Sequence, residues 1–180
     1  MKITFITSNK GKQAEVSAML PCQVIQRDMG YPEIQADTLQ DVAHYGLDWL
    51  RYQVDGTFIL EDAGIFIYGL QNFPGVYSSY VYQTIGNQGI LQLLEGADNR
   101  GATFRSVIGL YDGEEHFFIG ECPGSIAKEA RGKHGFGYDP IFIPEGSQRT
   151  FAEMEPAEKN QYSHRASAVK KIAAYLETIL

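Results

Sequence analysis

The order of strand-like and helix-like spacing near the start of the chain restricts the fold more than any other feature of this sequence. Ile3–Thr7 is a run of β-branched and aromatic residues, which favours a strand. The following segment, NKGKQAEVSAML, places apolar residues three and four positions apart, which is typical of a helix. Cys22–Gln26 again has the composition of a short strand. Strand, helix and strand in this order predict an α/β fold.

Further elements along the chain fit the same class. Thr38 is suited to cap a long helix whose apolar face runs to Val54. The segment TFILEDAGIFIYGL predicts a strand, an acidic turn and a second strand, whereas YSSYVYQT fits either a strand or a helix. A short helix is expected to end at Gly96. Two β-rich runs joined at Asp112-Gly113 predict a hairpin, and an amphipathic helix follows Ser163.

Length, charge and cysteine content narrow the class of protein. With 180 residues and no linker or repeat, residues 1–180 are predicted to form a single domain, or two lobes that share one sheet. The net charge of −7 disfavours nucleic acid and anionic membranes as partners. No segment approaches the roughly 20 apolar residues of a membrane span. Cys22 and Cys122 have no metal-ligand spacing, so two reduced thiols and a cytoplasmic location are expected.

Two polar clusters lie where strands are expected to end. TSNKGK, residues 7–12, occupies the first strand-to-helix turn, where backbone N–H groups and the helix dipole attract phosphate. It lacks the complete phosphate-loop motif, and a solvated helix start is an equal alternative. In EDAG, neighbouring strand residues point to opposite faces, so only one of Glu61 and Asp62 would face a Mg²⁺ site. The alternative is a solvated acidic turn.

A third cluster is the segment GFGYDPIF. Phe136 and Tyr138 flank Gly137 and would present flat ring faces to a base, because glycine allows a close approach. Asp139 would accept hydrogen bonds from ring N–H groups. The alternative is an aromatic turn that faces the core.

A fourth cluster, EKNQYSHR, lies at the expected start of the last helix. It contains Lys159, His164 and Arg165. Positive side chains there oppose the helix dipole, so a bound anion would relieve the conflict. This inconsistency between charge and local structure points to function.

Six ordered segments resemble one known family. ITSNKGK, PEIQ, EDAGIFIYGLQNFPGVYSSY, HGFGYDPIFIPEG, TFAEM and EKNQYSHRASAVKKI are similar, in order and spacing, to the inosine triphosphate pyrophosphatase family. The resemblance implies two lobes around a long curved mixed β-sheet flanked by helices, a nucleotide cleft between the lobes, and a homodimer. It also implies Mg²⁺-dependent hydrolysis of non-canonical purine nucleoside triphosphates, namely ITP, dITP and XTP, to the monophosphate and pyrophosphate, which cleanses the nucleotide pool.

The resemblance also implies roles for individual residues. Asp62 would be the catalytic proton acceptor, Glu33 and Asp62 would bind the metal, and His164 with Arg165 would read the purine. The substrate-binding residues that it implies are Thr7, Ser8, Asn9, Lys10, Gly11, Lys12, Ala63, Phe136, Gly137, Tyr138, Asp139, Lys159, His164 and Arg165.

Two positions depart from the family pattern. Ala63 stands where many members have serine, and Gly46 stands where many have a phosphate-binding lysine. Neutralisation of the triphosphate tail would therefore fall to the remaining basic residues, which are Lys10, Lys12, Arg131 and Lys133.

Three other functions stay open at this point. A Maf-type pyrophosphatase would share lysine-rich and acidic motifs but select other bases. A nucleotide-sensing module would bind without hydrolysis, against which the two carboxylates Glu33 and Asp62 argue. A purely structural domain would show no magnesium-dependent thermal shift with nucleotide.

Overall fold

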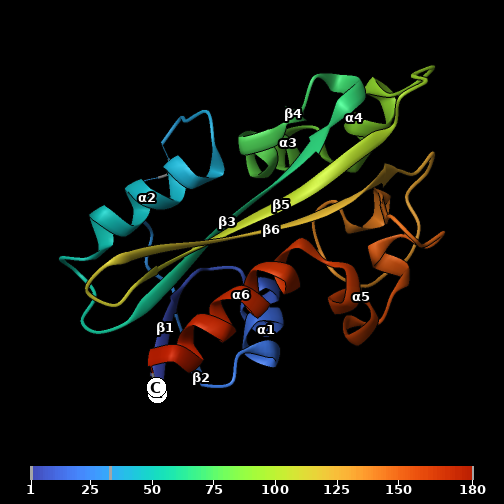
Figure 1. The fold of residues 1–180 in the computed structure, drawn as a ribbon. Coiled ribbons are helices and arrows are strands. Elements are labelled where there is room, and N and C mark those ends of the chain that lie inside the picture. Colours follow the sequence, from blue (N-terminus) through green and yellow to red (C-terminus); the bar gives the residue numbers. More distant parts are fainter. Residues whose placement is uncertain (1, 33, 180) are drawn as a thin grey trace. The chain divides into compact units, whose positions relative to one another are not determined.

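A computed structural model of the chain describes residues 2–32 and 34–179. The fold is α/β, with a mixed seven-stranded sheet in the order β2-β1-β3-β5-β6-β7 and with β4 paired to β3 (Figure 1). The strands are β1 (Lys2–Ile6), β2 (Gln23–Arg27), β3 (Phe58–Ile67), β4 (Phe73–Pro74), β5 (Gly101–Tyr111), β6 (Glu115–Ile126) and β7 (Phe142–Pro144). The α-helices are α1 (Lys10–Met19), α2 (Leu39–Leu50), α3 (Ser78–Thr84), α4 (Gly86–Leu93), α5 (Pro156–Tyr162) and α6 (His164–Ile179).

The chain divides into two compact units. Unit 1 comprises Met1–Asp62, Ser106–Gly120 and Arg165–Leu180. Unit 2 comprises Ala63–Arg105 and Glu121–His164. The strands β3, β5 and β6 each contribute residues to both units.

The core of unit 1 follows from strand alternation. In β1, Ile3 and Phe5 point to one face and pack with apolar residues of α1 and α6, which lie side by side next to β1 and β2 (Figure 1). Ile59 of β3 belongs to this cluster. The next residue, Leu60, instead contacts α2, where a Cβ on Gly46 would lie 2.8 Å from its Cδ2 atom. Successive residues of β3 therefore serve opposite faces of the sheet.

The core of unit 2 is rich in aromatic rings. Phe104 of β5 lies with its ring centroid 4.7 Å from that of Phe142 and 6.2 Å from that of Phe151. Buried aliphatic residues of β3, α3 and α4 complete this cluster, including Ile65, Val81 and Ile90.

Most of the predicted elements are confirmed. The first strand, helix and second strand are β1, α1 and β2, and the predicted hairpin is the antiparallel turn between β5 and β6, with Gly113 at positive φ. Thr38 caps α2 by accepting a hydrogen bond from the Asp41 N–H at 3.1 Å. This helix ends at Leu50, so its predicted extension to Val54 is wrong. YSSYVYQT forms mostly helix, as α3.

The acidic turn predicted at Glu61–Gly64 is also wrong. The whole EDAG segment lies inside the continuous strand β3. Gly64 does not mark a turn but a close approach, because a Cβ there would lie 2.3 Å from the Gly75 carbonyl oxygen. Glu61 is buried within the strand, and side chains distant in sequence compensate its charge, as described below.

Candidate functional site

The predicted phosphate turn, residues 7–12, comprises the connection after β1 and the first three residues of α1, all in unit 1. Asn9 is the N-cap of α1, and its Oδ1 atom accepts a hydrogen bond from the Lys12 N–H at 3.0 Å. The Asn9 N–H in turn donates to Thr7 Oγ1 at 3.1 Å. The side chains of Ser8 and Lys10 are exposed. The turn is thus ordered by its own side chains and presents polar groups at a helix N-terminus, where the dipole favours an anion.

A cluster of buried charges lies beside this turn and is centred on Glu61. The Glu61 carboxylate is 2.7 Å from the Lys12 amine and accepts from Arg165 Nε at 3.0 Å. Ser106 donates its hydroxyl to the same carboxylate at 2.6 Å. Arg165 also pairs with Glu15 of α1. We call these five residues the Glu61 cluster; α1, β3, β5 and α6 all contribute to it.

The charges of this cluster keep Glu61 ionised. Burial alone would raise the pKa of its carboxyl, but the positive charges of Arg165 and Lys12 and hydrogen bonds from Lys12 and Ser106 lower that pKa well below its usual range. For Arg165, burial works to lower the pKa, yet Glu61 and Glu15 raise it. The two groups therefore hold each other in their charged forms.

Asp62 follows Glu61 on the same strand and is half-buried. Strand alternation directs its side chain to the opposite face of β3 from Glu61. The prediction that only one of these two carboxylates faces a given site therefore agrees with the strand geometry. Glu33, the second predicted metal ligand, lies outside the described residues.

The predicted base-binding loop belongs to unit 2 and is organised by Asp139. One oxygen of its carboxylate accepts from the Phe136 N–H at 2.9 Å and from the Lys159 amine at 2.7 Å. Asp139 and Lys159 are only 3% and 4% exposed. The Lys159 amine also lies 5.0 Å from the centre of the Phe136 ring. Gly135 has positive φ, and a Cβ there would lie 2.0 Å from the Asp139 carboxylate, so the loop requires glycine at this position.

The aromatic residues of this loop differ in role. Tyr138 is buried and donates its hydroxyl to the Ser78 carbonyl at 2.7 Å, so in this structure it corresponds to the core-facing alternative. Burial raises its pKa. Phe136 is half-buried. Asn87 of α4 donates to the carbonyl of Gly137, which has positive φ, at 3.0 Å and ties the loop to that helix.

The residues predicted to read the base, His164 and Arg165, belong to different units. His164 is buried in unit 2 and stacks on Phe104, with ring centroids 4.5 Å apart and an interplanar angle of 9°. Arg165 is buried in unit 1, in the Glu61 cluster.

The predicted site residues therefore form two groups. Unit 1 contains the phosphate turn, Asp62 and Arg165, and unit 2 contains Ala63, the loop of residues 136–139, Lys159 and His164. Sequence reasoning missed Glu15 and Ser106. No local pattern indicates Ser106. Glu15 could have been found, because it follows Lys12 by three residues and residues three apart are neighbours on the surface of a helix.

At Gly46, where many family members have lysine, the structure leaves no room for a side chain. A Cβ at this position would lie 2.8 Å both from Leu60 Cδ2 and from the ring of Tyr31. The space that a side chain would need is thus filled. Of the other basic candidates in unit 2, Arg131 donates to the Gln148 carbonyl at 3.0 Å and Lys133 is exposed.

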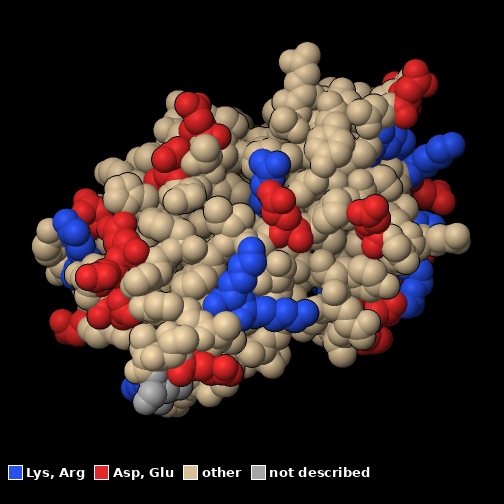
Figure 2. Space-filling view, viewed as in Figure 1, with Lys and Arg blue, Asp and Glu red and all other residues tan. Residues whose placement is uncertain are grey.

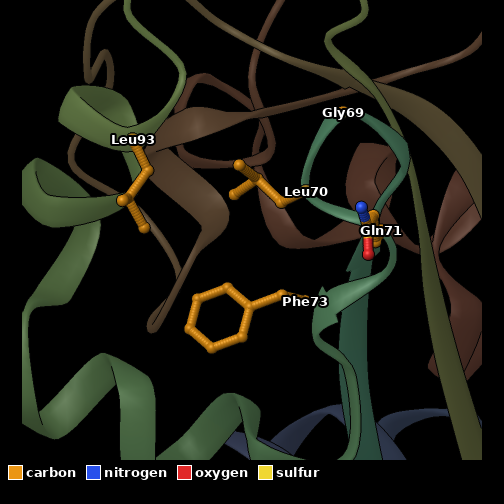
Figure 3. Close-up of a pocket in the computed structure, with 5 residues that line it drawn as sticks. All are labelled: Gly69, Leu70, Gln71, Phe73 and Leu93. Carbon is orange, nitrogen blue, oxygen red and sulfur yellow. The ribbon is translucent and has the colours of Figure 1, made fainter.

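A separate hollow lies in unit 2, away from the predicted site residues. Its volume is about 410 Å³, and it is lined by Gly69, Leu70, Gln71, Phe73 and Leu93. Figure 3 shows the side chains of Leu70, Phe73 and Leu93 directed toward this space. It contains none of the predicted site residues, and its lining is mainly apolar.

The surface carries charges of both signs. Figure 2 shows basic side chains over α6, which has the exposed residues Lys170 and Lys171, with acidic side chains on either side. Within the described ranges 2–32 and 34–179, no helix is long and apolar enough to cross a membrane.

Comparisons with known proteins match the whole chain. The dITP/XTP pyrophosphatase of Thermococcus kodakarensis is 55% identical over 98% of this chain and 98% of its own, and that of Pyrococcus horikoshii is 54% identical over 100% and 99%. The Ham1 protein structure from Staphylococcus aureus superposes with a TM-score of 0.87 at 27% identity, over 100% of both chains. The Coxiella burnetii HAM1 structure gives 0.85 at 32% identity, over 99% of each chain. The model of the Ham1 family matches residues 3–175, and the chain belongs to that family.

Proposed function

We propose that this protein is a nucleoside triphosphate pyrophosphatase that hydrolyses dITP and XTP, and also ITP, to the monophosphate and pyrophosphate. The observation that carries this function is the 55% identity, over 98% of both chains, to a dITP/XTP pyrophosphatase. Identity at this level makes the enzyme a hydrolase of phosphoric anhydride bonds. Removal of non-canonical purines from the nucleotide pool is the role that follows.

The residues of unit 1 are assigned to the phosphate end of the substrate. The polar groups of residues 7–12 at the start of α1 suit a triphosphate tail, because a helix N-terminus attracts anions. Lys12 is the basic residue of this turn whose position is fixed by an ion pair, and Lys10 is exposed. We assign Lys12 to the tail and Asp62 to the attacking water as proton acceptor.

Mg²⁺ fits the carboxylate that this chain offers. Among the described residues, no group of three or more His, Cys, Asp or Glu side chains is arranged to hold a metal ion. Mg²⁺ does not need such a group, because it is usually held by one or two carboxylates together with substrate phosphates and water. Asp62, with Glu33, would hold it. The ion would neutralise charge on the phosphates.

The residues of unit 2 are assigned to the base. Phe136 would stack on the purine, and the buried pair of Asp139 and Lys159 would keep its backbone in place. Arg165, although it is paired with two carboxylates in unit 1, is assigned to the base together with His164 by the family resemblance. A guanidinium has only donors, so it would donate a hydrogen bond to the O6 carbonyl of hypoxanthine or xanthine, whereas the amino group of adenine is itself a donor and would be rejected. The predicted cleft between two lobes stays a prediction.

A homodimer is the proposed assembly, and unit 2 has a surface suited to it. Apolar and aromatic side chains are exposed on the segment from β4 to α4, and two of them, Phe73 and Leu93, line the hollow of Figure 3. The exposed side chains are Phe73, Tyr77, Tyr80, Tyr82, Ile85 and Leu93. Contiguous exposed apolar residues mark interaction surfaces. Light scattering of the wild type should report a dimer, and Tyr80→Glu should dissociate it. Tyr52→Glu, which changes an exposed tyrosine of unit 1, should leave the dimer intact. Equal effects of the two variants would argue against this surface.

A cytoplasmic location also stays a prediction, and the two cysteines agree with it. Cys22 and Cys122 are both unpaired thiols. Burial raises the pKa of Cys122 to about 12, so this thiol is held neutral.

A substrate panel tests the proposed function. Purified protein is incubated with Mg²⁺ and ITP, XTP, dITP, ATP or UTP, and pyrophosphate and orthophosphate are measured separately. The expected result is pyrophosphate and monophosphate in equal amounts, from ITP, XTP and dITP but not from ATP. Stepwise release of orthophosphate would contradict the reaction, and a preference for UTP would favour the Maf-type alternative.

A further inference from the structure

The carboxylate of Glu61 is in an unusual position for a residue with no assigned role. Its side chain is 0% exposed, and it lies between two cations that come from different helices, Lys12 of α1 and Arg165 of α6. The Lys12 amine makes a second contact with the same residue, a hydrogen bond to the Glu61 backbone carbonyl at 3.1 Å. Two contacts from one residue thus fix the end of the Lys12 side chain.

Stability alone gives a weak reason for this arrangement. Buried ion pairs contribute little net stability, because the loss of hydration offsets the attraction between the charges. The Lys12 side chain is still 20% exposed, and it stands in the first turn of α1, where its positive charge opposes the helix dipole. Without a neighbouring anion, a lysine in the first turn of a helix would extend its side chain into water.

The charges of the Glu61 cluster also balance. Lys12 and Arg165 are positive, and Glu61 and Glu15 are negative. The cluster therefore has no net charge with which to attract an anion from a distance. What it supplies is a fixed location for one amine at the phosphate turn.

We propose that Glu61 is a positioning residue for hydrolysis, which acts by holding the Lys12 amine at the phosphate turn, on the strand that also carries Asp62. This inference rests on the proposed function for its kinetic consequence, since Lys12 is there assigned to the triphosphate tail. An amine that is already fixed loses no side-chain entropy when the leaving pyrophosphate gains charge. Its position therefore lowers the barrier of the chemical step and raises kcat. In this role Glu61 acts through Lys12, so it is a positioning residue and not a catalytic one.

The position of the Lys12 amine can be tested without substrate. The full-length protein is trace-labelled with acetic anhydride, and the labelling rates of Lys12 and Lys10 are compared by peptide mass spectrometry. Lys10 is the internal reference, because it begins the same helix and is exposed. In the wild type, Lys12 should react more slowly than Lys10. In Glu61→Gln, the rate for Lys12 should rise by about five- to tenfold, while that for Lys10 stays constant.

A matched variant separates positioning from general loosening of the cluster. Glu15→Gln also converts a carboxylate of the cluster to an amide, but Glu15 pairs with Arg165. Labelling of Lys12 should therefore rise less in Glu15→Gln than in Glu61→Gln. Should Glu61→Gln fail to fold, Glu61→Asp keeps the charge and withdraws it by one methylene, and it should give an intermediate rate.

Kinetics then measure the consequence for hydrolysis. Glu61→Gln should lower kcat for ITP by about 10- to 100-fold, because a displaced amine stabilises the transition state less. KM should be unchanged or lower, because the variant also removes one negative charge near the phosphates. Glu61→Asp should recover part of kcat. A variant that is merely less stable would instead lose activity in proportion to its unfolded fraction, measured by circular dichroism.

Several outcomes would overturn the proposal. Equal labelling rates of Lys12 and Lys10 in the wild type, or no rise in a folded Glu61→Gln protein, would show that Glu61 does not hold the amine. A normal kcat in Glu61→Gln would remove its role in hydrolysis. If the labelling changes as expected but no nucleotide is hydrolysed by the wild type, the contact stands and the proposed function fails.

Discussion

Removal of the Lys159 amine should strongly destabilise unit 2. In Lys159→Met, the Asp139 carboxylate would keep its hydrogen bond from the Phe136 N–H but lose the cation 2.7 Å away. Because the two side chains are only 5% and 4% exposed, water cannot replace that cation. Breaking a buried ion pair by removing one partner costs about 3–5 kcal/mol, a large part of the roughly 5–15 kcal/mol that stabilises a typical domain.

A double-mutant cycle isolates this pair. Asp139→Asn retains an acceptor for the Phe136 N–H but leaves the Lys159 ammonium buried without its counter-charge, so this variant should also be destabilised. The double variant has no buried charge in this pair, and it should be more stable than the sum of the two single effects predicts, by about 2–3 kcal/mol.

Urea unfolding followed by circular dichroism gives the free energies, and hydrogen exchange of the Phe136 amide reports on the loop itself. Lys133→Met is the control, since Lys133 is an exposed lysine of the same region and its loss should cost less than about 0.5 kcal/mol. If Lys159→Met also stays within about 1 kcal/mol of the wild type, the ion pair does not organise this loop and the reasoning is wrong.

Three other predictions concern single substitutions. Asp62→Asn should lower kcat by about 10²- to 10⁴-fold at an unchanged unfolding midpoint, and near-normal turnover would show that another group handles the water. Burial would raise the pKa of Asp112, but the hydrogen bond from the Tyr175 hydroxyl and other local contacts lower this pKa in the folded protein. Ionised Asp112 therefore stabilises the fold above the pKa that it has in the unfolded chain, and this stabilisation is lost as the pH falls through the lower pKa of the folded protein. Tyr175→Phe should therefore lower the melting temperature more at pH 7 than near about pH 2, and a loss that does not depend on pH would contradict this. Gly46→Ala should lower the melting temperature although alanine favours helix by about 1 kcal/mol, because its Cβ would overlap the Tyr31 ring at a cost of about 1–3 kcal/mol; a higher melting temperature would show that the ring moves freely.

Sequence patterns predicted elements best where the cause of the structure is local. The β-branched run of β1, the cap at Thr38 and the Asp112-Gly113 turn each depend on residues a few positions apart, and all three are confirmed. The same local reasoning failed at EDAG, where two acidic residues before a glycine resemble a turn. The strand continues there because the charge of Glu61 is compensated by residues 12, 106 and 165, which no local pattern connects.

The helix α5 was not predicted. It begins at Pro156, and at the first helical position the missing N–H group of proline costs nothing. In the candidate site, motifs identified residues with polar side chains but not their partners. That Lys159 lies on Asp139, or that Arg165 lies between Glu61 and Glu15, depends on how distant segments pack.

The division of the chain into units has a consequence for synthesis. Unit 1 takes residues from three separate segments, and the last of them, Arg165–Leu180, follows all of unit 2 in sequence. Chains are made from the N-terminus, and domains generally fold as units as they emerge from the ribosome. All residues of unit 2 are present once His164 has emerged, whereas β1 and α1, although they are made before unit 2, must wait for α6 to cover their apolar face. Elements that are translated before unit 2 are therefore among the last to reach their final packing.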